Sequence, residues 1–273
     1  MENILKNNEQ SYEACKTCFT CEQAAKNGHL NCLKILFENK CEWNERTCKE
    51  AAFNGNLDCL QYAHENGCPW DDWTCKDAAY NGHLEILKYA HVHGCPWNEY
   101  VCHYSALKGQ IECLKYAHEN NCPWNEKTCS HAAMYGHLEC LKYAHKNGCP
   151  WDVDTCSYAA VYGHLECLKY ARKNGCPWDV DTFSSAAKSG SLECLKYVYE
   201  NNCPWDRYPC PLAVLNNHLD CFKYLREKNF PWNKEECLKI AIENNETSII
   251  DYIKNLENSE TMKQKIKKFL IMK

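Results

Sequence analysis

The chain has 273 residues, a formal net charge of -5, and acidic and basic residues interleaved along most of its length. This charge gives no electrostatic basis for binding nucleic acid, so we do not expect that class of partner. No stretch approaches the roughly 20 apolar residues of a membrane span. Residues 1–10 are polar and lack a signal-peptide core. We therefore expect no membrane association and a cytoplasmic location.

Cysteine is frequent, with 24 residues in the chain. In a secreted protein this content would indicate a disulfide scaffold, because oxidising compartments let cysteines pair. A chain that stays in a reducing compartment carries thiols instead, and we expect that state here.

Tryptophan recurs eight times at a strict spacing of 27 residues. Spacing this regular indicates one supersecondary unit copied end to end, and such units stack instead of filling a single core. We predict an all-α solenoid of about nine helix-turn-helix repeats. The series is Trp43, Trp70, Trp97, Trp124, Trp151, Trp178, Trp205 and Trp232.

The predicted organisation has three parts. Residues 1–19 form an N-terminal cap, residues 20–235 form eight 27-residue repeats, and residues 236–273 form a degenerate ninth repeat and a C-terminal capping helix. Within the last part, residues 262–273 mix lysines with apolar residues, which predicts an amphipathic helix over the final repeat. A membrane-surface or targeting segment is the alternative interpretation.

Each copy begins with a short helix. Every tryptophan of the series is followed by Asp or Asn, whose short side chain can cap a first turn. In the copy that follows Trp124, the residues Cys129, Ala132 and Ala133 recur at helical spacing and predict a small apolar face. A glycine in the left-handed conformation is expected to end this helix, and Asn217 and Asn244 replace it in the last two copies.

A second helix follows within the same copy, over about residues 138–146. Its predicted inward series is Leu138, Leu141 and Ala144, with Cys140 and Tyr143 at the flanks. An Asn-Gly pair closes the helix, and the following proline prevents its continuation.

The run Thr-Cys-x-x-Ala-Ala-x-x-Gly-His-Leu-Glu-Cys-Leu-Lys-Tyr, at residues 128–143 and again at 155–170, resembles the helix pair of ankyrin repeats. The period of 27 is shorter than the roughly 33 residues of that family. The missing residues fall where ankyrin repeats project a β-hairpin. This shortened Cys-Pro-Trp-Asp form resembles the large ankyrin-like families of giant DNA viruses of amoebae.

The resemblance implies a non-catalytic protein-protein interaction scaffold, with host proteins as partners and the host cytoplasm as the location if the source is viral. Some viral ankyrin proteins carry an F-box-like segment that recruits a ubiquitin ligase, so a substrate adaptor is an alternative. Neither the 19 N-terminal residues nor the short tail leaves obvious room for such a segment.

Most cysteines fall into three columns of the repeat. The alternative to packing is metal binding, for which His145, Cys149 and Cys156 could supply nitrogen and thiolate ligands, and equivalent sets recur at His64/Cys68/Cys75 and His118/Cys122/Cys129. The columns argue against this alternative, because Ile86, Phe183 and Phe230 replace cysteine without breaking the period. A buried apolar residue can take the place of a packing thiol, whereas it cannot take the place of a metal ligand.

We therefore expect packing thiols, no resident metal and no cofactor. The run Cys15-x-x-Cys18-x-x-Cys21 is the best remaining metal or redox candidate. Packing is favoured even there, since Cys21 belongs to a core column. A metal- or redox-responsive thiol protein remains the alternative function from a different class.

No catalytic set interrupts the repeat, so we expect that the protein is a monomer and not an enzyme.

Positions that are fixed in every copy most simply serve stacking, and positions that vary are free to meet a partner. Tyr, Trp and Met are enriched at interface cores. The alternative is that these tyrosines only cover grooves between repeats. The candidate partner-binding residues are Trp73, Tyr100, Tyr104, His131, Tyr135, Tyr158 and Tyr162.

Overall fold

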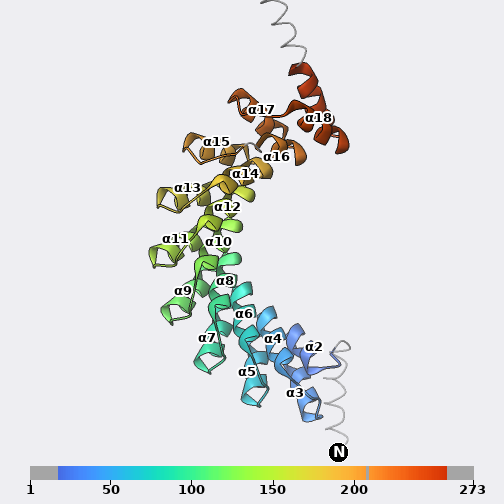
Figure 1. The fold of residues 1–273 in the computed structure, drawn as a ribbon. Coiled ribbons are helices and arrows are strands. Elements are labelled where there is room, and N and C mark those ends of the chain that lie inside the picture. The colour runs from blue at the N-terminus through green and yellow to red at the C-terminus, as the bar shows by residue number, and fades with distance from the viewer. Residues whose placement is uncertain (1–17, 207–208, 257–273) are drawn as a thin grey trace, which may run out of the picture. The chain divides into compact units, whose positions relative to one another are not determined.

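A computed structural model of the chain describes residues 18–206 and 209–256 (Figure 1). The described residues contain helices and no strand, and successive helices pair as the predicted helix-turn-helix units. The predicted all-α solenoid is confirmed. The chain divides between Pro150 and Trp151 into two compact units, and each unit is described by itself.

The first unit contains five helix pairs within its described residues. The first helix of each pair packs on the first helix of the next pair and on its own second helix, so the first helices form one row and the second helices another (Figure 1). The helices are α2 (Cys21–Asn27), α3 (Leu30–Glu38), α4 (Glu45–Asn54), α5 (Leu57–Glu65), α6 (Asp72–Asn81), α7 (Leu84–Val92), α8 (Glu99–Leu107), α9 (Ile111–Glu119), α10 (Glu126–Met134) and α11 (Leu138–Lys146).

The second unit continues the same arrangement within its own described residues. Its first helices α12, α14, α16 and α18 pack in sequence, and residues 247–256 are helical after α18. The helices are α12 (Val153–Val161), α13 (Leu165–Lys173), α14 (Val180–Ser189), α15 (Leu192–Glu200), α16 (Pro209–Leu215), α17 (Leu219–Glu227) and α18 (Lys234–Glu243).

The Asp or Asn after the tryptophan caps the first helix, as the sequence predicts, in every copy whose cap is described, which leaves out Asp206 before α16. Asn44 and Asn125 each accept a hydrogen bond from the backbone N–H two residues later, at 3.0 Å. Asp179 does the same at 3.1 Å and also accepts from the N–H of Thr182. These bonds satisfy N–H groups that the first turn of a helix leaves without a partner.

The turn between the two helices depends on one left-handed residue. Gly55 has a φ of +80°, and a Cβ built there would lie 2.7 Å from the ring of His83 in the next copy. Asn217 takes the left-handed conformation in the second unit with a φ of 58°. The prediction for the last copy was wrong by one residue, because Asn244 has a φ of −95° and Asn245 is the left-handed residue. The turn after α18 is therefore shifted by one position.

The core lies between the two helices of a copy. Cys129, Ala132 and Ala133 of α10 are fully buried, as predicted. On α11 the inward residues are Cys140, Leu141 and Ala144. The predicted inward series was wrong at Leu138, which is only half-buried, and Cys140 belongs to the core instead of the flank. Leu138 is the first residue of the helix, one turn before the fully buried Leu141.

Each tryptophan of the series in the first unit joins two copies. The ring of Trp97 stacks on His91 of its own copy, with centroids 3.7 Å apart, and meets the edge of Tyr116 in the next copy at 6.3 Å. The Tyr116 hydroxyl is 2.9 Å from Nδ1 of the same histidine. In the second unit, the Arg172 guanidinium takes the histidine's place, 4.3 Å from the centroid of Trp178. The change from His to Arg therefore preserves a planar group over the indole.

Two predicted segments fall beyond the described part of the chain. Residues 1–17 of the N-terminal cap and the amphipathic tail at 262–273 both lie outside it. The first described helix has Thr20 as its N-cap, and that hydroxyl accepts from the N–H of Gln23 at 3.2 Å. The division into a cap, eight repeats and a C-terminal capping helix stays a prediction. None of the described helices is long and apolar enough to cross a membrane.

Candidate protein-binding face

The seven candidate residues occupy three positions of the first helix. They stand two, six or ten residues after the N-cap residue of their copy, as with Tyr100 and Tyr104 after Asn98. Residues four apart share one face of an α-helix, so these positions form a single outward column on each helix. The opposite face of the same helix carries the buried Cys and Ala residues of the core.

Trp73 and Tyr100 are joined by a lysine. The Lys76 ammonium lies 4.6 Å from the ring centroid of Trp73 on α6 and 4.9 Å from that of Tyr100 on α8. Lys49 of α4 lies 4.6 Å from Trp73 as well. The indole is therefore in contact with cations from two helices, and each such contact stabilises the ring by about 0.5–2 kcal/mol.

Lys76 is buried although it is charged. Its side chain is only 8% exposed, and its ammonium lies 2.6 Å from a carboxylate oxygen of Asp72. Asn98 of the next copy donates a hydrogen bond to the same oxygen at 2.8 Å. The hydrogen bond from Lys76 is the main cause that lowers the pKa of Asp72. The charged pair is thus fixed between α6 and α8, directly beside the two exposed rings.

Tyr104 belongs to a second group of rings on the same helices. Its ring meets the edge of Tyr80 on α6 at 5.8 Å, and Tyr80 stacks on Phe53 of α4 at 6.5 Å. Tyr100 and Tyr104 are stacked at 6.0 Å, which joins the two groups. We define the aromatic face as these rings from three successive first helices: Phe53, Trp73, Tyr80, Tyr100 and Tyr104.

Two other candidates in the first unit, His131 and Tyr135, lie on and just after α10. The ring of His131 meets His103 of α8 at 5.5 Å. Burial is the main cause that lowers the pKa of both histidines. His103 lies 2.7 Å from the side-chain oxygen of Asn125 and is itself buried. Tyr135 is 48% exposed. The His103 ring also meets the edge of Tyr100 at 5.4 Å, so His131 is linked to the rings of α6 and α8 through His103.

The remaining candidates, Tyr158 and Tyr162, belong to the second unit. They stand four residues apart along α12 and its C-cap, and Tyr162 is exposed. Burial raises the pKa of Tyr158, and the nearby Asp154 and Asp152 act in the same direction. These two tyrosines therefore form a local pair, whereas the other five candidates belong to the first unit.

Asp77 is the most unusual titratable group beside the aromatic face. It is buried, and its Oδ2 has no hydrogen-bond partner. Burial raises the pKa of this carboxyl group to about 6, although the charge of nearby Lys49 acts in the opposite direction. The side chain is therefore close to its titration point near neutral pH, while Asp72 five residues earlier stays ionised.

Sequence reasoning missed the lysines and Asp77. Lys49 and Lys76 stand five residues after the N-cap, a position at which later copies carry His103 or Ser130. The usable signal is that Trp73 and Lys76 are three residues apart, a spacing that brings side chains together on a helix. What the spacing cannot indicate is the contact with Tyr100 across two copies.

The cysteine columns pack as small apolar groups. Cys113 and Cys140 are 1% exposed, and burial raises the pKa of these thiols to about 11 and about 12. The Cys68 and Cys95 thiols donate hydrogen bonds to backbone carbonyl oxygens 24 residues earlier, at 3.3 and 3.2 Å. Cys113 and Cys140 therefore stay protonated at neutral pH, and protonated thiols are poor metal ligands and poor nucleophiles.

The histidines of the proposed column sets have another role. His64 stacks on Trp70 at 3.7 Å and His118 stacks on Trp124 at 4.0 Å. Among the described residues, only Cys18, His29 and Cys32 bring three potential metal ligands together. Cys21, the other described member of the Cys-x-x-Cys run, is fully buried in the core as predicted.

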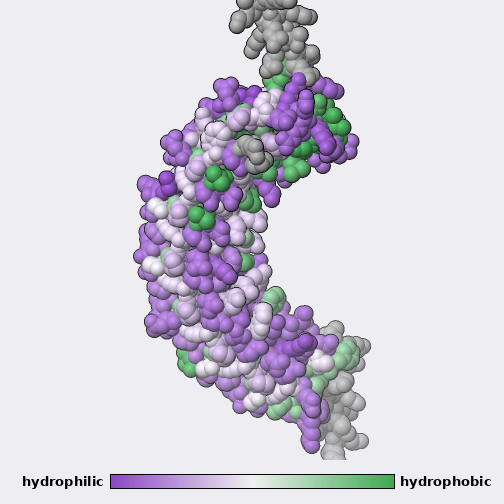
Figure 2. All heavy atoms as spheres, viewed as in Figure 1, coloured by the Kyte–Doolittle hydropathy of each residue, from purple (hydrophilic) through white to green (hydrophobic). Residues whose placement is uncertain are grey.

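Figure 2 shows that the face turned to the viewer is mostly hydrophilic along the first unit, with hydrophobic colour there in small separate areas. Exposed large apolar or aromatic side chains of the first unit include Trp73, Tyr100 and Tyr135. Amphipathic rings of this kind can remain in water in the absence of a partner and still supply contact area when one binds.

Two segments of the chain match family models of ankyrin repeats. A family model described as ankyrin repeats in three copies matches residues 75–155, and one described as ankyrin repeats in many copies matches residues 21–64. The crystal structure of the human ASB11 ankyrin repeat domain is similar with a TM-score of 0.51 and 19% sequence identity, covering 57% of this chain and 84% of that chain. At this identity the likeness shows the fold alone. The comparison with curated proteins returned no match.

Proposed function

We propose that the chain is a non-catalytic scaffold that binds another protein through the aromatic face of its first unit, because two of its segments match ankyrin-repeat family models. Repeats of this family are generally protein-protein interaction modules. One observation carries the choice of surface. Trp73 and Tyr100 are 43% and 42% exposed, yet both rings lie against the same buried lysine.

Fixed aromatic rings favour binding for an entropic reason. A side chain that becomes immobilised at an interface costs about 0.5–1.5 kcal/mol, and a ring already held in place avoids most of that cost. Trp and Tyr are also enriched among the residues that contribute most to binding energy. Here the cation contacts and the Asp72–Lys76 pair hold the rings before any partner arrives.

The aromatic face also differs in composition from the groups that recur in several copies, and this difference supports a role in binding. The stacking residues of the second helices repeat from copy to copy, as in the Trp–His–Tyr groups around Trp70 and Trp97. The group Trp73, Lys76 and Tyr100 occurs once among the described residues. A feature needed for stacking is expected in every copy, whereas a feature needed for one partner is expected at one place.

The proposal extends to the type of partner. The 27-residue period and the lack of strands in the described helical repeats support a relation to the shortened ankyrin-like families of giant DNA viruses that the sequence resembles. Host proteins are then the proposed partners, with the chain acting as a monomer in the host cytoplasm. Tyr158 and Tyr162 are a second proposed contact region, on the second unit.

The test is affinity purification from candidate host cells with matched variants. We expect the parent chain to capture a specific partner and the Trp73→Ala/Tyr100→Ala variant to lose it. Val92→Ala is the control, because Val92 lies on α7 of the same unit and is 74% exposed. A partner lost equally with Val92→Ala, or retained by the double variant, would contradict the assignment of this face.

A Tyr158→Ala/Tyr162→Ala variant tests the second region separately. Loss of the partner in this variant alone would place the contact on the second unit and overturn the choice of the aromatic face. Circular dichroism of each variant must match that of the parent, since a change in helical content would explain lost binding without any role in recognition.

A further inference from the structure

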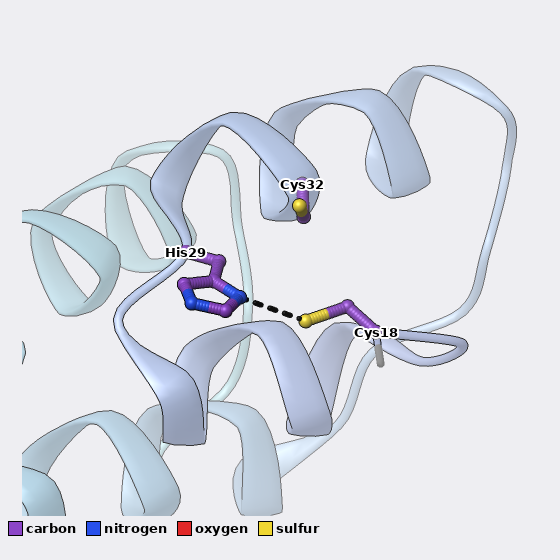
Figure 3. Close-up of side chains that lie close together, drawn as sticks. All are labelled: Cys18, His29 and Cys32. Atoms are coloured by element: carbon purple, nitrogen blue, oxygen red, sulfur yellow. Dashed lines mark hydrogen bonds between the residues drawn. The ribbon is translucent and has the colours of Figure 1, made fainter. Parts of the chain in front are cut away.

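Three potential metal ligands meet at the start of the first unit. Cys18 precedes α2, His29 lies in the turn between α2 and α3, and Cys32 is in the first turn of α3. Their ligand atoms all lie within 4.8 Å of one another. Figure 3 shows the Cys18 sulfur directed at the His29 ring and Cys32 on the neighbouring helix, and Cys18 Sγ lies 3.2 Å from His29 Nδ1. The sequence does not show this group, because Cys18 and His29 are 11 positions apart in the chain.

The role of His29 differs from that of its equivalents in later copies. His83 and His218 each lie close to a backbone carbonyl oxygen of the preceding first helix, at 3.2 and 2.9 Å. Asn56 makes the same link by donating to the carbonyl oxygens of Ala25 and Lys26. The His29 ring lies beside the Cys18 thiol, with Nδ1 3.2 Å from Sγ.

Cys32 differs from its column in a similar way. The equivalent Cys59, Cys113 and Cys140 are each 1% exposed. Cys32 is only half-buried, because it belongs to the first copy. An ion from solvent can reach this thiol, whereas it cannot reach the others without opening the core. The first copy therefore has the same cysteine as Cys59, Cys113 and Cys140 at this position, but its thiol is more accessible than theirs.

We propose that Cys18, His29 and Cys32 bind one Zn²⁺ ion as two thiolates and a neutral imidazole. Zinc is borderline-soft, prefers sulfur and nitrogen ligands, and takes a tetrahedral arrangement with a fourth position left here for water or another ligand. On binding, each thiol forms a Zn–S bond and releases one proton to solvent. Two thiolates balance the two positive charges of the ion.

The observed spacing is close to what the ion requires. A tetrahedral site with a Zn–S distance of ~2.3 Å and a Zn–N distance of ~2.1 Å places the sulfur roughly 3.6 Å from the nitrogen. The observed separation of Cys18 Sγ and His29 Nδ1 is 3.2 Å. The widest pair, at no more than 4.8 Å, closes with a side-chain movement of roughly 1 Å. No helix has to move.

The ion would join the segment before α2 to the first turn of α3. This contact would hold the first helix pair together at an end of the stack that no further described copy covers. Since zinc would bind the folded arrangement, it would raise the apparent stability of the chain by mass action. The site is independent of the aromatic face, which lies on α4, α6 and α8.

Two variants of the site are available from the repeat itself. Gln110 occupies the position of His29 in a later copy, and Ile86 occupies the position of Cys32. His29→Gln and Cys32→Ile therefore introduce residues that this fold already accepts at equivalent positions. Cys18→Ser completes the set. The matched control is His83→Gln, which makes the same chemical change at a histidine that contacts a carbonyl oxygen.

The experiment measures the zinc content of purified, reduced full-length protein by mass spectrometry, and its affinity by competition with a chromophoric chelator. We expect one zinc per chain in the parent and in His83→Gln. Each of the three site variants should lose the metal or bind it at least about 100-fold more weakly. With Co²⁺ as the probe, the parent should show thiolate-to-cobalt charge-transfer absorption, and Cys18→Ser should lose most of it.

Three results would overturn the proposal. The first is a parent protein that binds neither Zn²⁺ nor Co²⁺ while its circular dichroism shows a folded chain. The second is metal retained at full stoichiometry by the folded His29→Gln and Cys32→Ile variants. The third is a disulfide between Cys18 and Cys32 that persists in the reduced preparation, because a disulfide sulfur supplies no thiolate.

Discussion

The two helix rows of the first unit use aromatic residues differently. Beside the second helices, Trp70 and Trp97 lie in the segments that follow α5 and α7. Each stacks on a histidine of the preceding helix and meets a tyrosine of the next copy, with nearly the same distances. On the first helices, Trp73 contacts two lysines in an arrangement that the other described copies lack. Repetition identifies contacts that hold the stack together, and departure from repetition identifies a surface that can serve a partner.

The largest expected effect breaks the repeated core. We expect Leu141→Ala to reduce the free energy of unfolding by about 2–5 kcal/mol, because the side chain is fully buried between helices. Leu138→Ala should cost about 1 kcal/mol, since Leu138 is half-buried. Urea denaturation followed by circular dichroism measures both. Equal losses would show that Leu138 does belong to the core series.

The next effect compares two tryptophans directly. Trp97→Ala should cost about 2–4 kcal/mol of stability, because it removes contacts with His91 and Tyr116 that join two copies. Trp73→Ala should cost about 1 kcal/mol, since its ring is exposed and held mainly by cation contacts. The same denaturation experiment applies. A larger loss for Trp73 would make it a stacking residue and remove the contrast between the rows.

These two comparisons show what the sequence could predict. The period, the N-caps and the left-handed glycine gave the helix pairs and most of the core, because each depends on residues close together in the chain. The sequence also proposed Trp73, Tyr100 and Tyr104 as variable residues of the outer face, and the structure exposes Trp73 and Tyr100 but leaves Tyr104 half-buried. It could not indicate that Lys76 lies between two of their rings, since that contact joins α6 to α8.

The same limit explains the N-terminal cluster. The Cys-x-x-Cys spacing singled out Cys18 but suggested Cys15 and Cys21 as its neighbours in function. Cys21 points into the core, because it occupies the column of fully buried thiols on the first helices. His29 and Cys32 approach Cys18 only through the turn between α2 and α3. Regular columns describe the middle of a stack well and its first copy less well.

A smaller effect concerns titration beside the aromatic face. Because the pKa of Asp77 is raised to about 6, folding favours its protonated form. The ionised Asp77 carboxylate therefore destabilises the folded chain. This destabilisation is absent below the pKa of Asp77 in the unfolded chain, ~4, and is complete above its pKa in the folded chain. We expect Asp77→Asn to stabilise the chain by about 1–3 kcal/mol at pH 7, with the gain shrinking as pH falls from about 6 to about 4.

Stability measured across this pH range in parent and variant tests the prediction. Asp72→Asn is the matched control, and it should destabilise the chain at neutral pH, because the pKa of Asp72 is lowered chiefly by its bond to Lys76. The Asp72 contribution is present at neutral pH and is lost as pH falls through the lowered pKa. The same sign of effect for both variants would contradict the described environments.

The central claim is that the first-helix row of the first unit meets the partner while the second-helix row supports it. Hydrogen–deuterium exchange of the chain with and without its captured partner tests this most directly. The account predicts slower exchange on binding in peptides from α6 and α8, with little change in α7 and α9. Protection confined to α7 and α9 would contradict it and place the partner on the repeated row.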